Sequence, residues 1–334
     1  MDFKTIIIAE AGVNHNGSLE TARQMVDEAA KAGADYIKFQ TFKADKLVTK
    51  TCKAAGYQSE NCSVESQDEM LRSLELTEQE FFILNQYCKN KGIGFLSTPF
   101  DEESIEFISS LKPDFMKVPS GEITDLPYLR KMASTGISMI ISTGMSTMKD
   151  IKNALVPFIE SGYTADNLYI LHCTTQYPTP YEDVNLLAIK TLSEKFGFPV
   201  GYSDHTRGIE VPIAAVALGA LIIEKHFTIS RNMKGPDHRA SLEPKELAEM
   251  VRGIRNVEIA LGNGEKIITD SEKSNIKAAR RSIVSKKFIR KGEIITEDKI
   301  TVKRPGDGLS PMLWDSILGT QAIRDFNPDE LIEI

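Results

Sequence analysis

Residues 6–41 of the chain read IIIAEAGVNHNGSLETARQMVDEAAKAGADYIKFQT. Two short runs rich in apolar and β-branched residues, 6–11 and 36–41, enclose an amphipathic stretch over 19–34. Gly33 stands where such a helix would end in the left-handed conformation. This order predicts a strand, a helix and a second strand that runs parallel to the first.

The same alternation continues along the chain. Further strand-like runs lie at 94–98, 115–120, 138–143, 168–174, 199–203 and 221–227, and helical patterns include 77–92, 101–112 and 148–162. Eight strands that alternate with helices predict an α/β fold of the (β/α)8 TIM-barrel type. A doubly wound open sheet is the alternative, but AEAGVNHNG (9–17) lacks the GxGxxG spacing of a dinucleotide-binding turn.

The pattern changes after a last helical stretch at 243–262, which ends the predicted barrel domain, 1–262. Residues 263–281 are polar and charged and are predicted to form a linker. Residues 282–334 contain short β-type runs broken by turn signals, which predicts a small, mostly β domain. Because this module is near the lower size limit for a core of its own, we expect it to dock on another surface.

Composition and charge exclude several classes of protein. The chain has 334 residues, 41% hydrophobic and 26% charged, with a net charge of −7, which is typical of a soluble protein and argues against nucleic-acid binding. The N-terminal apolar run is too short for a signal peptide or a membrane span, so we expect a cytoplasmic protein that does not bind membranes. The four cysteines show no CxxC spacing and are predicted to be reduced thiols that fill core or loop positions.

Polar residues gather at the predicted carboxyl ends of the strands, where TIM-barrel active sites lie. They are Glu10, Lys38, Gln40, Ser97, Thr98, Lys117, Ser120, Glu122, Ser142, Thr143, Thr175, Tyr177, Ser203, Asp204, His205, Glu224, His226 and Asp237. Burying a polar group inside a barrel is costly unless the group is satisfied. So many of them on one face predict a functional site. The long, polar segment 42–76 is predicted to form a loop at its rim.

Chemistry can be assigned to three pairs of these residues. A lone histidine is most often a hydrogen-bonded core residue, but His205 and His226 end neighbouring strands, and two adjacent imidazoles suit a divalent Mn, Fe or Zn ion. Lys38 and Lys117 are flanked by apolar residues, which favours a pocket for phosphate or carboxylate over surface salt bridges. Glu10 and Glu122 are candidate acid–base groups, because a walled pocket moves carboxyl pKa values toward neutrality.

Ten motifs, taken in order, cover essentially the whole chain. They are IIAEAGVNHNG (7–17), IKFQTFKAD (37–45), LSTPFD (96–101), KVPSGE (117–122), ISTGM (141–145), HCTTQYPTP (172–180), GYSDHT (201–206), EKHFT (224–228), GPDH (235–238) and KRPGDG (303–308). With these motifs the chain resembles the sialic acid synthase family, which includes neuraminate, legionaminate and pseudaminate synthases. The C-terminal module is similar to the antifreeze-like SAF (β-clip) domain of these enzymes.

The resemblance implies an enzyme that condenses phosphoenolpyruvate with an N-acylated mannosamine-type sugar and releases phosphate by C–O cleavage. It further implies a Mn²⁺ or Mg²⁺ cofactor and a domain-swapped homodimer. N-acetylneuraminate synthase, with N-acetylmannosamine as acceptor, ranks first because that substrate is common. Legionaminic acid synthase, with 2,4-diacetamido-2,4,6-trideoxymannose as acceptor, is the alternative. The segment 42–76 would distinguish the two sugars at C4 and C6.

The resemblance also implies roles for single residues. The metal ligands would be His205 and His226, and the catalytic groups would be Glu10, Glu122, Lys38 and Lys117. Phosphoenolpyruvate would be held by Lys38, Lys117, Thr98, Ser120, Ser142 and Ser203, in a pocket lined by Gln40, Thr175 and Tyr177. Asp237 would contact the sugar. Arg304 would reach the barrel of the partner subunit and hold the N-acyl group, and this would explain a module too small to stand alone.

Rival functions of other classes stay open at this point. A metal-dependent aldolase, which is a lyase, would need no phosphate pocket, so the paired lysines argue against it. A Schiff-base aldolase would use Lys117 or Lys38 to form an imine. A non-catalytic sugar-binding protein would not need the acid, metal and lysine set together.

Overall fold

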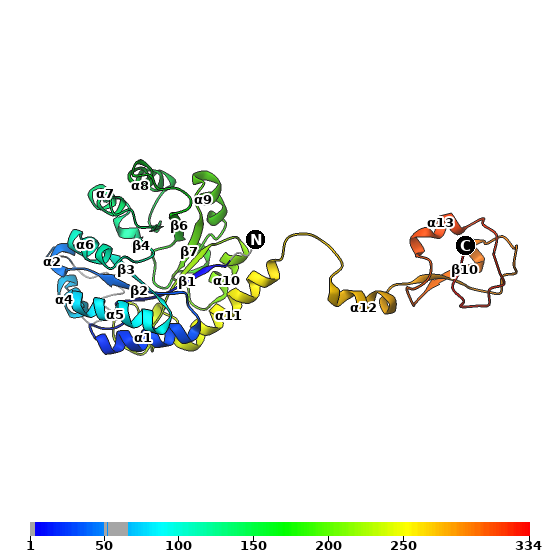
Figure 1. Ribbon diagram of the computed structural model, residues 1–334, viewed down its shortest axis with the longest axis horizontal. Helices are drawn as coiled ribbons and strands as arrows, with labels where there is room; N and C mark the ends of the chain where they lie inside the picture. The colour runs from blue at the N-terminus through cyan, green and yellow to red at the C-terminus, as the bar shows by residue number, and fades with distance from the viewer. Residues whose placement is uncertain (1–3, 50–51, 53–65) are drawn as a thin grey trace. The chain divides into compact units, whose positions relative to one another are not determined.

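The computed structural model describes residues 4–49, 52 and 66–334, and the chain divides into two compact units, Met1–Asn263 and Gly264–Ile334 (Figure 1). Among these described residues, none of the helices combines the length and the apolar character needed to cross a membrane. Cys88 and Cys173 are buried and are free thiols.

The first unit is built on a sheet of eight strands. They are β1 Ile6–Gly12, β2 Tyr36–Thr41, β3 Gly94–Pro99, β4 Met116–Val118, β5 Met139–Ser142, β6 Leu168–Cys173, β7 Val200–Asp204 and β8 Ile222–His226. The paired strands are parallel, in the order β3-β2-β1-β8-β7-β6-β5-β4. Because β3 also lies against β4, the sheet closes on itself. The predicted (β/α)8 barrel is confirmed, and the doubly wound alternative is wrong.

Helices surround the strands of the barrel (Figure 1). They are α1 Leu19–Ala32, α5 Glu78–Lys91, α6 Glu102–Ser110, α7 Leu126–Ala133, α8 Met148–Glu160, α9 Ala188–Phe196, α10 Glu210–Ala217 and α11 Pro244–Leu261. Side chains such as Ser18 and Thr77 cap the first turns, and Gly33 and Gly92 end α1 and α5 in the left-handed conformation. The apolar faces of these helices pack on the outer side of the strands and form the main core of the unit.

Two predicted segments differ from the structure. The fourth strand, expected over 115–120, ends at Val118, because Pro119 leads into the short 3-10 helix η1, Ser120–Glu122. The segment 42–76 is not all loop, since it contains α2 Ala44–Leu47 and α4 Gln67–Leu74. Residues 50–51 and 53–65 of that segment lie outside the described residues.

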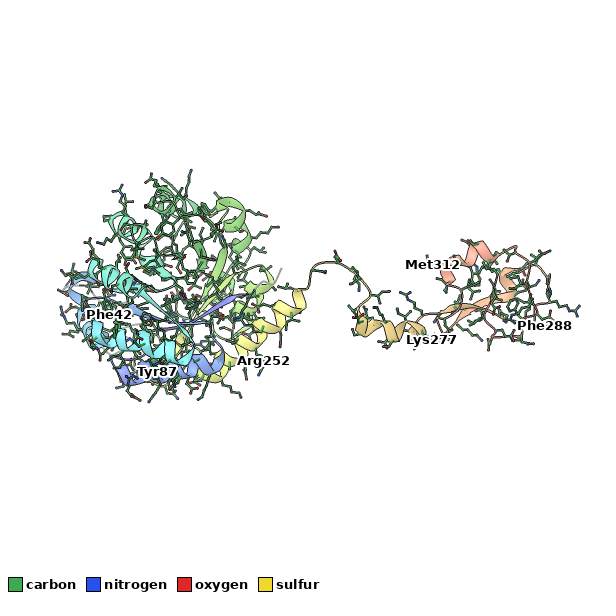
Figure 2. The ribbon with its side chains drawn as sticks, viewed as in Figure 1. Phe42, Tyr87, Arg252, Lys277, Phe288 and Met312 are labelled. Atoms are coloured by element: carbon green, nitrogen blue, oxygen red, sulfur yellow. The ribbon has the colours of Figure 1, made fainter. Side chains whose placement is uncertain are left out.

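The second unit contains α12 Asp270–Ala279, which lies within the predicted linker, and a small domain with strands β9 Ser282–Ser285 and β10 Ile300–Lys303. The two strands pair antiparallel. The short turn η4 Glu297–Lys299 lies just before β10, and η5 Pro311–Leu313 and α13 Trp314–Ile317 follow it. Its buried core consists of Ile283, Ile289, Ile295, Ile300, Ile317, Ala322, Phe326 and Ile332. The side chains of Phe288 and Met312 point outward from this unit (Figure 2).

Candidate active site

Strand register brings the polar strand ends of the barrel to one level. In β1, Glu10 stands opposite Lys38 of β2 on one side and opposite His226 of β8 on the other. Gln40 stands opposite Thr98 of β3. Because side chains alternate along a strand, these residues share the inner face of the barrel. They open into a cavity of about 460 Å³ at the carboxyl ends of the strands.

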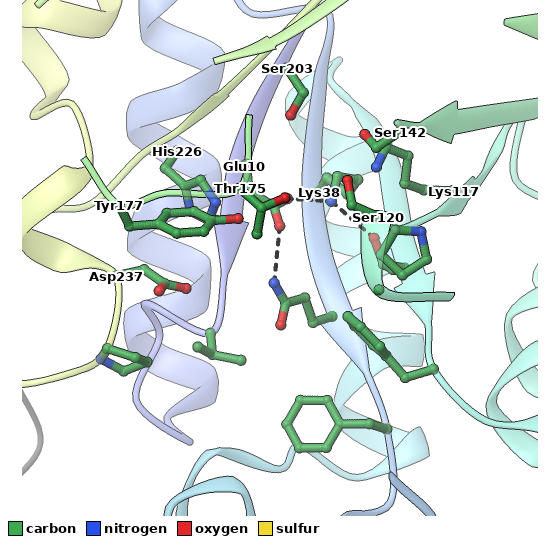
Figure 3. A pocket seen from close by; sticks show the side chains of 18 of the residues that line it. Glu10, Lys38, Lys117, Ser120, Ser142, Thr175, Tyr177, Ser203, His226 and Asp237 are labelled. Atoms are coloured by element: carbon green, nitrogen blue, oxygen red, sulfur yellow. Dashed lines mark hydrogen bonds and ion pairs between the residues drawn. The ribbon is translucent and has the colours of Figure 1, made fainter. Parts of the chain in front are cut away.

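Most of the predicted site residues line this cavity. They are Glu10, Lys38, Gln40, Thr98, Lys117, Ser120, Ser142, Thr175, Tyr177, Ser203, His205, His226 and Asp237. Figure 3 shows Lys117, Ser120 and Ser142 on one side of Glu10 and Lys38, with Tyr177, His226 and Asp237 on the other.

A buried network of charges forms the floor of the cavity. Lys38 Nζ lies 2.8 Å from Glu10 Oε2 and donates to Thr98 Oγ1 at 2.9 Å. Glu224 lies between the two lysines, with Oε2 3.7 Å from Lys38 Nζ and Oε1 3.8 Å from Lys117 Nζ, and Oε1 accepts from Ser203 Oγ at 3.0 Å. All four charged side chains are buried, so their charges act on one another in a medium of low dielectric constant.

Burial and pairing move the pKa values of these groups in different directions. Burial raises the pKa of Glu10 to about 7, although Lys38 opposes the shift. Burial also acts to raise the pKa of Glu224, but Lys117 and Lys38 outweigh it and the net pKa is lowered. Burial lowers the pKa of Lys117, partly offset by Glu224. Glu10 is therefore the carboxyl group of the floor that can exchange a proton near neutral pH.

Hydroxyl groups beside Lys117 form the part of the cavity best suited to an anion. Ser142 Oγ and Thr175 Oγ1 are buried and have no hydrogen-bond partner in the described part of the chain. Ser120 Oγ accepts from the backbone N–H of Gly144 at 2.9 Å. A Cβ at Gly144 would lie 2.1 Å from Thr175 Oγ1, so only glycine allows this close approach. Phosphate oxygens can satisfy unpartnered hydroxyls of this kind.

The two histidines lie side by side, with ring centroids 5.3 Å apart, and the ring of Tyr177 covers His205 at 4.1 Å. His205 Nδ1 lies 2.7 Å from the carbonyl oxygen of Thr174, so in the neutral ring Nδ1 carries the hydrogen and Nε2 has a free lone pair. Burial opposes a charged ring here, but the nearby Cys173 thiol outweighs it and the pKa of His205 is raised. His226 Nδ1 is buried without a partner among the described residues. Burial, and then the proximity of His205, hold the pKa of His226 well below its usual range, which favours the neutral form that binds metals.

These two imidazoles fit a divalent metal as an incomplete ligand set. The residues that the structure describes contain no cluster of three or more His, Cys, Asp or Glu side chains that could hold a metal ion. The remaining coordination positions would therefore belong to water or to a substrate, as in catalytic metal sites. Asp237 lines the same end of the cavity, and burial raises its pKa to about 6.

The outer part of the cavity has an apolar wall. The wall consists of Val13, Phe42, Leu47, Met70, Leu71, Leu74 and Phe100. Its members from α2 and α4 show that segment 42–76 does border the site, as predicted from its length and position. Val13, Phe42, Ala44, Met70, Leu71 and Leu74 form a hydrophobic cluster separate from the barrel core.

Three residues stand differently from the expectations, and the reach of Arg304 into a partner subunit stays a prediction. Cys173, taken as core or loop filling, lines the cavity, with Sγ 3.9 Å from His205 Nδ1; its strand-end position opposite Ser203 was the signal. Glu224 was recognised at a strand end but given no role. Glu122 lies in η1, half-buried, and is not among the residues that line the cavity. Arg304 belongs to the second unit, where Nε donates to the carbonyl oxygen of Ala279 at 3.0 Å.

Comparisons with known proteins agree with this fold. The NeuB family model matches residues 25–266, and the SAF domain model matches residues 280–333. An N,N'-diacetyllegionaminic acid synthase from Campylobacter jejuni is 48% identical over 330 residues, which cover 98% of this chain and 99% of the relative. A protein of the same name from Legionella pneumophila is 47% identical over 318 residues, 94% of this chain and 89% of the relative.

Among solved structures, the N-acetylneuraminic acid synthetase of Leptospira borgpetersenii, in complex with citrate, aligns with a TM-score of 0.73. It is 36% identical, and the alignment covers 82% of this chain and 91% of that structure. The resemblance inferred from the ten motifs is thereby confirmed. The chain belongs to the NeuB family of nonulosonic acid synthases and carries a C-terminal SAF domain.

Proposed function

We propose that the protein is an N,N'-diacetyllegionaminic acid synthase. It would condense phosphoenolpyruvate with 2,4-diacetamido-2,4,6-trideoxymannose and water, and release phosphate. The observation that carries this choice is near full-length identity of 48% and 47% to two enzymes of that name, against 36% to the N-acetylneuraminic acid synthetase. These comparisons favour the alternative over the N-acetylneuraminate synthase that the sequence analysis ranked first.

The floor of the cavity supports phosphoenolpyruvate as the donor. Lys38 and Lys117 supply two buried positive charges, and Ser142 Oγ and Thr175 Oγ1 supply unpartnered hydroxyls. A phosphate and a carboxylate on one small molecule match this combination of charges and hydroxyls. An aldolase that acts on keto acids does not need to bind a phosphate group. The hydroxyl cluster beside Lys117 therefore argues against that rival function.

His205 and His226 would hold Mn²⁺ or Mg²⁺, and an imidazole pair suits Mn²⁺ better. The free lone pair expected at His205 Nε2 and the unpartnered Nδ1 of His226 are consistent with such an ion. When bound, the ion would supply Lewis-acid polarisation of the aldehyde of the open-chain sugar. Tyr177, packed on His205, and Asp237 at the same end would limit the orientations that the sugar can take.

The chain's own residues account for the other steps. The methylene carbon of phosphoenolpyruvate forms the new C–C bond to the aldehyde carbon, and water adds to the resulting oxocarbenium carbon. Glu10 lines the cavity, whereas Glu122 does not, so Glu10 is the carboxylate placed to take the proton of that water. As the C–O bond to phosphate breaks, Lys38 and Lys117 stabilise the charge on the leaving group.

The apolar wall supports a deoxygenated acceptor. With the aldehyde near the histidines, the far end of an extended sugar chain reaches toward α2 and α4. The C6 methyl and the acetamido methyl groups of the trideoxy sugar can be buried on this wall, whereas a C6 hydroxyl would lose its hydrogen bonds to water there. Among the described residues of the cavity, the cationic side chains are the two floor lysines and the histidine pair, none of which lies on the wall to hold a sugar phosphate.

The test is phosphate release from phosphoenolpyruvate by the Mn²⁺-loaded enzyme, with three acceptors in parallel. They are the diacetamido-trideoxy sugar, N-acetylmannosamine and N-acetylmannosamine 6-phosphate. The proposal expects the highest kcat/KM with the first. Preference for either of the other two would overturn the legionaminate assignment but keep the synthase. No release with any of them would overturn the synthase reaction, and borohydride trapping with pyruvate would then test the Schiff-base aldolase.

A further inference from the structure

We infer that Asp204 and Lys225 are positioning residues that set the geometry of the histidine pair from outside the substrate cavity. Each of them stands immediately before one of the two histidines, Asp204 before His205 and Lys225 before His226. They are partners in the register of β7 and β8. Neither is among the residues that line the cavity, and no role has been given to them so far.

The two side chains form a fully buried ion pair between the barrel and its helices. Both have a relative exposure of 0%, and Lys225 Nζ lies 2.5 Å from Asp204 Oδ2. Side chains alternate along a strand, and the hydrogen bond from Ser203 to Glu224 shows which residues point into the barrel. Asp204 and Lys225, one position further along each strand, therefore point to the opposite side.

The hydrogen bonds of this pair enclose the backbone on both sides of His205. Lys225 Nζ donates to the carbonyl oxygen of Thr206 at 2.5 Å. Asp204 Oδ1 accepts from the backbone N–H of Thr206 at 3.0 Å and from Tyr202 Oη at 3.1 Å, and Oδ2 accepts from Thr206 Oγ1 at 3.0 Å. Lys225 thus ties the residues before and after His205 to the strand that carries His226.

Energetics favour a positioning role over a purely stabilising one. A buried ion pair is often no more stabilising than a well-packed apolar pair, because both charges lose their hydration. Its directional hydrogen bonds, however, permit one spacing between the strands, where apolar contacts tolerate several. Since a metal site needs its ligands held closely in place, the pair would raise metal affinity without touching the metal. The inference rests on the proposed metal site.

The experiment measures Mn²⁺ affinity of the full-length protein without substrates, by the EPR signal of free Mn²⁺, together with the melting temperature. Asp204→Asn and Lys225→Met are each expected to weaken Mn²⁺ binding by about tenfold or more, the range for residues that orient metal ligands. The control is Asp35→Asn, which breaks the ion pair of Asp35 with Arg255 at the amino ends of the strands. It should lower the melting temperature and leave Mn²⁺ affinity within about twofold.

A double variant separates positioning from stability. Asp204→Leu with Lys225→Met removes both charges, so the melting temperature should recover relative to the single variants, while Mn²⁺ affinity stays about tenfold weak. Recovery of both quantities together, or wild-type Mn²⁺ affinity in the single variants, would overturn the inference.

Two further measurements keep the inference testable. If the buried variants do not fold, Thr206→Val, which removes one donor to Asp204, should still weaken Mn²⁺ binding about threefold at a melting temperature near that of the wild type. Unchanged affinity in this variant would overturn the inference. If the wild type itself does not bind Mn²⁺, both the proposed metal site and the inference are overturned. If the wild type binds Mn²⁺ and the variants bind it equally well, only the inference is overturned.

Discussion

Glu10 is a buried carboxyl residue that stands between the two halves of the site. Its two strand neighbours are Lys38 and His226, and its carboxylate bonds to Lys38 while accepting from Gln40 Nε2 at 3.3 Å. The group therefore lies between the anion-binding floor and the histidine pair.

The pH dependence of the free energy of unfolding should show the titration of the Glu10 carboxyl group. With a folded pKa near 7 and an ordinary value of 4.5, Glu10 contributes stability that is complete below pH 4.5 and is lost as pH rises through 7. The free energy of unfolding of the wild type, relative to Glu10→Gln, should therefore fall by on the order of 2 kcal/mol between pH 5 and 8. Urea unfolding of the metal-free wild type and Glu10→Gln proteins at the two pH values measures this difference in the free energy of unfolding.

Glu224→Gln is the matched control for that experiment. The pKa of Glu224 is lowered by its lysines, so its contribution is present above its unfolded pKa and is lost only in more acidic solution. Between pH 5 and 8 the difference between the wild type and this variant should stay flat. Equal slopes for the two variants would contradict the assignment of the raised pKa to Glu10.

A second prediction about a single residue concerns Lys117. Replacing it with methionine keeps the apolar stem and removes one of the two buried positive charges of the cavity floor, so KM for phosphoenolpyruvate should rise at least about tenfold. KM for the sugar should change little. Steady-state kinetics with each substrate varied in turn measures both, and Lys131→Met, on the outer face of α7, is the control. An effect confined to the sugar would contradict the location of the phosphate site.

Alternation along strands explains which site residues could be predicted from the sequence. Lys38 with Gln40, and Glu224 with His226, share a face because they are two positions apart, and the register places Lys38 and His226 on either side of Glu10. Cys173 was missed because a small apolar thiol at a strand end resembles core packing. Glu122 was expected in the cavity because the strand was extended through Pro119, whereas the turn of η1 places it outside the cavity lining.

At the scale of elements, α2 and α4 were the part of the barrel unit hardest to predict. α2 has four residues and α4 has eight, too few for a helical period to be recognised in a polar segment. The strands were easier because buried parallel strands are continuous apolar runs with sharp ends. The consequence is functional, since these two short helices supply much of the apolar wall.

The wall makes a prediction about acceptor choice. Met70, on α4, is buried and lines the cavity, and glutamine has nearly its shape but carries a polar amide. Met70→Gln should reduce the preference in kcat/KM for a 6-deoxy acceptor over its 6-hydroxy analogue by about tenfold, since one methyl contact in an apolar pocket has that order of effect.

The same acceptor pair tested on Met312→Gln gives the control, because Met312 is 91% exposed in the second unit. If Met70→Gln turns over both sugars normally and keeps the ratio of their kcat/KM values, then another surface of the protein contacts C6 of the sugar.

At the scale of the whole molecule, the change in sequence pattern near residue 263 predicted two parts, and the structure divides there into two compact units. The reason is physical: each unit has its own buried apolar cluster, and α12 between the barrel and the small β domain has no buried residue. What the composition could not indicate is that this polar stretch is partly helical. Its helix begins with a capping box between Thr269 and Glu272, and an ion pair between Lys277 and Asp307 connects it to the small domain.

Limited proteolysis should detect the junction between the units. Lys266 is exposed, as are the residues on both sides of it, so trypsin is expected to cut there before it cuts within β1–β8. Mass spectrometry of early time points identifies the cleavage site. The barrel fragment should keep the melting temperature of the barrel in the intact chain, because its core is complete without the rest. Protection of Lys266 would mean that another surface covers this stretch.

The separate hydrophobic cluster that supplies most of the apolar wall has a consequence for how such enzymes diversify. Its six buried residues share no member with the core that holds the barrel together. Substitutions among them can reshape the outer end of the cavity while the scaffold keeps its own packing, and the catalytic floor, anchored on the strands, stays in place. On the proposed function, acceptor choice would thereby be an exchangeable property of the molecule, which natural variation or directed evolution could alter without changing the residues that carry out the reaction.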